Sequence, residues 1–315
     1  MFHVTRGPMS LPSFVHDVAW TFAEFVNEES YKFAATGRAE YPMVAPEGGK
    51  EPLRAEYSAY TMGSDHDVYQ DSSFGIPAIY LNDWPDRYIH TNFDTAANID
   101  PTKLKRAAFI GAASGYCLSQ IHSHEDLLRM ALIGREGDLR RSYRMLWSQL
   151  SVETFAEKDN LLFALYQYEL LAANSASSWL QGDKTPWAIE LETSGWTADS
   201  SEAIKRQAAK TAPDVGRPKF KRKEDPKGPL VVFGYDYFAE HAKAAGVVTP
   251  KLLSYEGLWG GGEEYAYEVL NFADGKRNAQ EIRDAVSAEY GPVPLEMVVE
   301  YLKALEKIGV VEQMK

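Results

Sequence analysis

Cysteine and long apolar runs are almost absent from this sequence, and both absences narrow the class of protein. Cys117 is the one cysteine in 315 residues, which excludes an internal disulfide and a cysteine-based zinc site. No run of 18 apolar residues occurs, so no membrane-spanning helix is expected. The chain opens at Met1 directly into a strand-like stretch without a signal peptide, which leaves its compartment undetermined.

Positive charge is also scarce. The chain has 33 Lys and Arg against 45 Asp and Glu, a net charge of −12. An acidic chain is a poor default partner for nucleic acid or for anionic lipid. The hydrophobic fraction of 45% is ordinary for a globular protein, and the length allows two or three domains.

The first 123 residues alternate strand-like and helix-like stretches, which predicts an α/β domain. Apolar residues at helical spacing predict a helix over 10–25, and Asp100-Pro101 provide the start of a second helix that runs to about residue 122. Ser64 and Asp67 predict a capping box for a short helix that Gly75 ends. The remaining elements expected here are a surface loop over 36–56 and a buried strand over 76–81.

Three further regions follow. Residues 124–182 are expected to be helical, with helices over 138–150 and 160–180. Residues 183–229 are predicted to be a basic, proline-rich linker, because 205–227 carries nine Lys or Arg against three Asp or Glu. Residues 230–315 form the last region.

That C-terminal region resembles a winged-helix module, with its compact part over 264–315. Asn278 and Glu281 predict a capping box, and Gly291-Pro292 predict the end of the same helix. These local signals predict that 264–315 folds independently of residues 1–123. Its many carboxylates disfavour a DNA-reading face, so no nucleic-acid partner is expected.

The most informative pieces lie between residues 57 and 122: Gly63-Ser64-Asp65-His66, Gly75-Ile76-Pro77-Ala78, His90-Thr91-Asn92-Phe93-Asp94-Thr95 and Asn98-Ile99-Asp100-Pro101. Each piece alone has an ordinary structural interpretation. His90 fits a surface histidine, Asp65 fits a helix-start residue, and Asp94 fits a turn or cap residue.

In this order and spacing the pieces resemble the di-zinc exopeptidases of the bacterial leucyl aminopeptidase and glutamate carboxypeptidase type, metallopeptidase family 28. The resemblance covers about a fifth of the chain. It implies that residues 1–123 are the C-terminal part of a catalytic α/β domain of the phosphorylase/hydrolase-like type. The expected fold is a partial mixed sheet in which parallel strands predominate.

The same resemblance implies roles for particular residues. His90 matches the last zinc ligand in chain order, and Ser64, Asp65, His66 and Asp94 match positions that support the ligands. Tyr60 is a candidate oxyanion stabiliser, although it lies one position off the family spacing and also fits an edge-strand aromatic. In the family, two zinc ions polarise the scissile carbonyl and activate a water.

This sequence departs from the family pattern where the other ligands should lie. They precede the Ser-Asp-His segment in the family, and only 63 residues precede it here. His16-Asp17 lies within a helical pattern, Glu28-Glu29 at a helix end, and Glu263-Glu264 in the wrong order, at the start of the terminal helices. We therefore expect at most one partial zinc site, and an isolated chain that is inactive.

Two hypotheses follow. The first is a zinc-dependent exopeptidase, aminopeptidase-like and acting on peptides, present without most of its metal ligands; such a parent enzyme can be secreted or periplasmic. The second is a non-catalytic interaction protein that keeps a degenerate peptidase-like half-domain. In both, an unpaired sheet edge predicts self-association.

Overall fold

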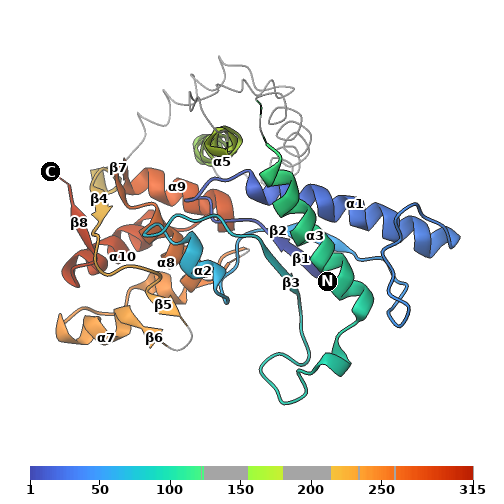
Figure 1. Cartoon of the computed structure of the whole chain (residues 1–315). Coiled ribbons are helices and arrows are strands. Elements are labelled where there is room, and N and C mark those ends of the chain that lie inside the picture. The colour runs from blue at the N-terminus through green and yellow to red at the C-terminus, as the bar shows by residue number, and fades with distance from the viewer. Residues whose placement is uncertain (122, 124–154, 180–213, 233–234, 259, 315) are drawn as a thin grey trace.

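The computed structural model describes residues 1–121, 123, 155–179, 214–232, 235–258 and 260–314 (Figure 1). Its N-terminal half, residues 1–121, is built on a three-stranded sheet in the order β2-β1-β3. β1 (Phe2–Thr5) pairs in parallel with β2 (Ala55–Ser58) and antiparallel with β3 (Tyr80–Asp83). The prediction of an α/β fold with a mixed sheet is confirmed, but parallel pairing does not predominate.

Two helices cover one face of this sheet. α1 (Val15–Thr36) and α3 (Pro101–Ser119) pack against each other and enclose a core that includes Phe2, Val4 and Ile110. As predicted, Asp100 caps α3 by accepting a hydrogen bond from the Thr102 backbone N–H, and Pro101 opens the helix.

Other local predictions need correction. α1 starts later than predicted and runs on to Gly37, whose φ of 71° ends it, because its buried positions continue to Val26 and Ser30. The predicted strand over 76–81 begins only at Tyr80. Ile76 is 52% exposed, and its backbone N–H donates to Tyr69 O, so this stretch belongs to the turn after α2 (His66–Gln70).

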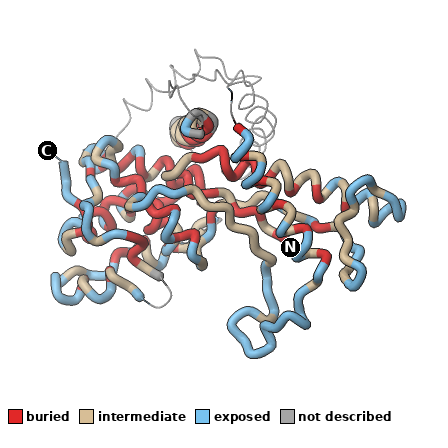
Figure 2. The backbone as a smooth tube through the Cα atoms, in the orientation of Figure 1, coloured by how far each residue is buried: buried red, intermediate tan, exposed pale blue. Residues whose placement is uncertain are grey.

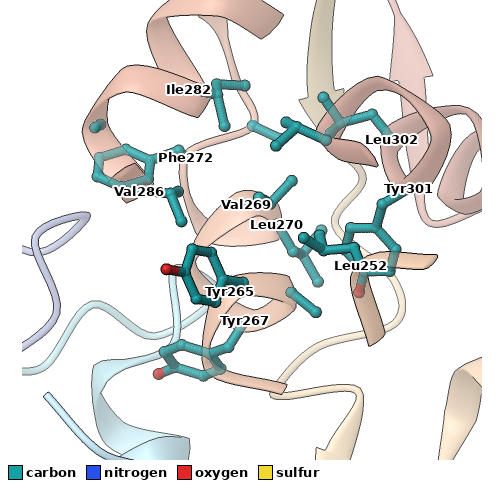
Figure 3. Close-up of a cluster of buried hydrophobic side chains, with 14 of the residues drawn as sticks. Leu252, Tyr265, Tyr267, Val269, Leu270, Phe272, Ile282, Val286, Tyr301 and Leu302 are labelled. Carbon is teal, nitrogen blue, oxygen red and sulfur yellow. The ribbon is translucent and has the colours of Figure 1, made fainter. Parts of the chain in front are cut away.

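The C-terminal half, the described residues from 214 to 314, consists of helices packed around one core, with a small sheet. α8 (Gly262–Asn271), α9 (Ala279–Tyr290) and α10 (Leu295–Lys307) supply most of the buried side chains in Figure 3. Asn278 and Glu281 form the predicted capping box, and α9 ends before Gly291, at φ 96°. Both termini of α9 therefore lie where its local sequence predicts.

The sheet of this half corrects the predicted linker. Its strand order is β7-β4-β8, and the central strand β4 (Lys219–Arg222) lies inside the predicted 183–229 linker. β4 pairs antiparallel with β7 (Asp274–Asn278) and β8 (Val311–Gln313). The basic stretch alternates, with Phe220 fully buried between exposed lysines, which is the pattern of a half-buried strand.

The remaining elements complete the described chain. The predicted helix over 160–180 is observed as α5 (Phe155–Ser175) followed by a 3-10 turn (Ala176–Trp179), whereas the one over 138–150 lies outside the described residues. Also present are β5 (Val231–Val232), β6 (Tyr235–Asp236), α7 (Tyr237–Ala244) and 3-10 turns at Ala96–Asn98, Asp214–Gly216 and Lys251–Ser254. Among the described helices, none is long and apolar enough to cross a membrane.

Candidate functional site

The Ser-Asp-His segment begins α2, but it is held differently from the predicted capping box. Asp65 is the N-cap residue and its side chain makes no capping bond. Asp67 does not reach back to Ser64. Its two carboxylate oxygens accept from the Tyr60 hydroxyl at 2.6 Å and from the Gly63 backbone N–H at 2.8 Å. The carboxylate thus fixes the loop that leads into α2 rather than the end of the helix.

Tyr60 lies in the interior of the protein. Its side chain is 0% exposed and its ring stacks on Tyr267 of α8, with centroids 5.2 Å apart. Burial raises the pKa of the Tyr60 hydroxyl far above its usual value, so the group stays protonated. An oxyanion-stabilising role would require Tyr60 to exchange Asp67 for a substrate.

His66 is also buried, at 5% exposed. Its Nε2 lies 2.8 Å from the Thr61 carbonyl oxygen, and its ring stacks on Tyr80 of β3 at 4.0 Å. Burial lowers the pKa of His66, so the neutral ring donates from Nε2 to that carbonyl. His66 therefore connects the start of α2 to the sheet and to the preceding loop.

His90 lies far from this packed cluster, on the exposed loop between β3 and α3. Its backbone is in the left-handed region, at φ 59°. His90 and Asp94 are both exposed, and neither side chain hydrogen-bonds to another described residue. In Figure 1 this loop extends away from both halves. The structure therefore does not join His90 to Asp94, or to the Ser64–His66 segment.

The donor set does not fit a pair of zinc ions. Within the described part of the chain, no group of three or more His, Cys, Asp or Glu side chains is arranged to hold a metal. Catalytic zinc needs about three protein ligands around each ion. His90 provides one candidate nitrogen, so no catalytic step through zinc follows from these residues alone.

Two of the three rejected ligand pairs, His16-Asp17 and Glu263-Glu264, lie in helices as expected. His16 is 1% exposed, and its Nε2 lies 3.1 Å from Gln70 Oε1 and 3.0 Å from Ala78 O. Burial lowers its pKa to about 4, so it is neutral at physiological pH. Glu263 and Glu264 lie in the first turn of α8, where Glu264 accepts from the Gly261 N–H.

Two deeply buried acidic groups were not identified from the sequence. Glu268 on α8 and Glu289 on α9 are at most 2% exposed. They accept hydrogen bonds from the consecutive backbone N–H groups of Ser10 and Met9, which belong to the N-terminal half. Burial and mutual proximity raise the pKa of Glu289 well above its usual range.

This pair forms part of a contact between the two halves. Tyr267 on α8 donates its hydroxyl proton to the backbone oxygen of Asp67 at 2.8 Å. Arg222 of β4 pairs with Asp71 at 2.9 Å, and Asn271 Oδ1 accepts from the Ser72 N–H. The segment around α2 is thus held from the C-terminal side. Periodicity gives no signal for such contacts, because each partner is distant in sequence.

Comparison with known proteins supports the resemblance over one part of the chain. No curated protein and no solved structure matches the sequence. Residues 27–114, which contain the Ser64-Asp65-His66 segment and His90, match the profile of Peptidase family M28.

Proposed function

We propose that residues 27–114 are part of a zinc-dependent exopeptidase domain of the aminopeptidase type, whose ligand set is completed from outside the described residues. The family match carries this proposal. It is supported by the position of His90, an exposed imidazole on a long loop that a second group of ligands can approach. Peptides are the substrate class that the family implies.

The isolated chain is not expected to be an active peptidase. A co-catalytic pair needs ligands for two ions held about 3.5–4 Å apart. The described residues contain no group of three or more candidate ligands arranged to hold a metal, and the Glu263-Glu264 pair is engaged in the start of α8.

Activity tests this directly. The purified chain, supplied with zinc, should give no chelator-sensitive hydrolysis of leucyl and other aminoacyl p-nitroanilides. Addition of a protein segment that carries the missing ligands is expected to produce turnover that His90→Ala removes. Chelator-sensitive turnover by the chain alone would show that its ligands were misassigned, and a complemented enzyme insensitive to His90→Ala would contradict the role of His90.

Zinc affinity provides a second test. A single histidine binds zinc weakly, because affinity follows the number of ligands and their preformed geometry. Calorimetry should show no stoichiometric tight binding, and His90→Ala should change the trace little. The matched control is His3→Ala, which removes another imidazole outside the family match. Tight binding lost only in His90→Ala would reveal additional ligands.

The second candidate function is a non-catalytic interaction protein. It is favoured by Tyr60 and Asp67, which lie inside the matched residues 27–114 yet serve the contact with Tyr267. In this hypothesis the helical region and the winged-helix-like C-terminal region are the working parts. The absence of measurable duplex DNA binding at physiological salt is expected in both cases.

The sheet edge available for self-association is β3. On the β2 side, the Asn27 amide bonds both the N–H and the carbonyl of Ala55, at 2.7 and 2.8 Å, and so occupies that edge. β3 has no strand partner beyond β1 among the described residues. Analytical ultracentrifugation should show concentration-dependent association, and a concentration-independent monomer would contradict this surface.

A further inference from the structure

A cavity of about 380 Å³ lies between α5 and α9. One wall is a stripe of α5 that includes Phe163, Ala164 and Gln167. The facing wall comes from α9 and includes Asp284 and Ala285. Figure 1 shows α5 end-on beside α9, remote from the His90 loop. The volume lies within the range of small-molecule sites, about 300–1,000 Å³.

One end of the cavity is negatively charged. Asp284 is only 7% exposed, and its Oδ1 accepts from Gln280 at 2.8 Å and from Arg283 at 2.9 Å. Its second oxygen accepts no hydrogen bond from the described residues. The Arg283 guanidinium also forms an ion pair with Glu157, at 3.0 Å. The two carboxylates, Asp284 and Glu157, therefore have one guanidinium between them, and the group carries a net charge of −1. Burial raises the pKa of Asp284 to about 6.

The other charged groups that line the cavity make contacts of their own. Arg277 pairs with Asp274 at 2.6 Å, and its guanidinium lies over the Phe272 ring. Glu281 accepts from the Asn278 N–H as part of the capping box, a hydrogen bond that leaves its negative charge in place. A ligand therefore encounters the incompletely compensated charges of Asp284 and Glu281, and both are negative.

The walls add one donor and an apolar surface. Gln167 Nε2 is buried and has no hydrogen-bond partner among the described residues. A buried amide donor without an acceptor is costly, so a ligand oxygen here would satisfy it. Phe163, Leu171 and Phe272 provide apolar lining for a hydrophobic body.

We propose that this cavity binds a small molecule with a protonated primary amine on an apolar body, the ammonium group against Asp284 and the body between α5 and α9. An adjacent carbonyl oxygen on the ligand would accept from Gln167. Apolar amino-acid amides and the amino termini of short peptides have this chemistry. The site involves no metal and is independent of the proposed peptidase function.

The test compares phenethylamine with 2-phenylethanol, its neutral counterpart, by calorimetry on the full chain at pH 7.5. Phenethylamine should bind saturably at one site, at least tenfold more tightly than the alcohol. Asp284→Asn should weaken amine binding at least tenfold and leave the alcohol unchanged. Ala164→Leu, which fills the cavity from α5, should weaken both ligands. The matched control Glu296→Gln, an exposed carboxylate on α10, should change neither.

The comparison of phenethylamine with 2-phenylethanol on the wild-type protein tests the proposal even if a variant fails to fold. Equal affinity for amine and alcohol, or no saturable amine binding, would overturn the proposal. Retained amine affinity in a folded Asp284→Asn protein would also overturn it. Folding of each variant is checked by its thermal unfolding transition.

Discussion

The two halves of this protein differ in how completely their side chains are buried. In the C-terminal half, the helices bury Tyr265, Val269, Ile282 and Leu302 completely, at 0% exposure. In the N-terminal half, the loop between β3 and α3 is exposed along almost its whole length, as Figure 2 shows. The family match covers 27–114, so it falls on the half that is less completely packed.

The residues that match a family profile are therefore largely different from the residues that form the larger buried core. His90 lies within the residues that match the family profile, yet the described residues bring no group of three or more candidate ligands together that could hold a metal. The larger buried core lies mostly outside the matched residues and is stabilised by ordinary apolar burial. Contacts from that region, above all Tyr267, hold part of the family segment in place.

The largest effect on folding is expected when two fragments of the C-terminal half, which start at different residues, are compared. A fragment 260–315 lacks β4, which pairs with both β7 and β8 and buries Phe220, so it should be largely unfolded. A fragment 214–315 retains that strand and should show helical circular dichroism and a cooperative transition. Cooperative melting of 260–315 would restore the prediction of independent folding made from local signals alone.

Tyr267 tests the contact between the halves. Tyr267→Ala removes the stack on Tyr60 and the hydrogen bond to Asp67, and should cost about 3–5 kcal/mol of unfolding free energy, the range for buried aromatics. Tyr267→Phe keeps the ring and should cost about 1 kcal/mol. Urea denaturation measures both. Equal losses in the two variants would show that the stack contributes little.

The Glu268–Glu289 pair predicts a pH dependence. The folded-state pKa of Glu289 is raised, so its contribution to stability is complete below about pH 4.3 and is lost as pH rises toward the folded value. Glu289→Gln keeps the shape without the charge and should gain stability over the wild type as pH rises from 5 to 8. The other titratable groups that face this pair are Arg6, Tyr290 and Tyr265.

Urea denaturation at both pH values measures the difference. Glu296→Gln, whose side chain is exposed, should show no such trend. A constant difference between Glu289→Gln and the wild type would mean that Glu289 does not titrate in this window.

The smallest effect is expected at His90. Its φ of 59° is a conformation that glycine adopts without strain, and its side chain has no hydrogen-bond partner in the described structure. His90→Gly should stabilise the chain slightly, by no more than about 1 kcal/mol. A loss above that size would show that the imidazole already makes stabilising contacts.

Elements with both boundary signals in the local sequence could be predicted. Asp100-Pro101 gave the start of α3, and Asn278, Glu281 and Gly291 gave both ends of α9. These signals act within one turn of the chain, so neighbouring residues are sufficient. The resemblance to the exopeptidase family was also recognised from sequence, because the order and spacing of the motif pieces are themselves the signal, and the profile match over 27–114 supports it.

What only the tertiary structure decided involves partners distant in the chain. Asp67 fits a helix cap by position, but it binds Tyr60 and Gly63 because the contact with Tyr267 buries this segment. A basic stretch that resembles a linker becomes the central strand β4 once β7 and β8 supply its hydrogen bonds. The sequence by itself determined the caps of α3 and α9 and the resemblance over residues 27–114. Strand pairing and buried polar contacts depended on the fold, because their free energy exists only when distant groups meet away from water.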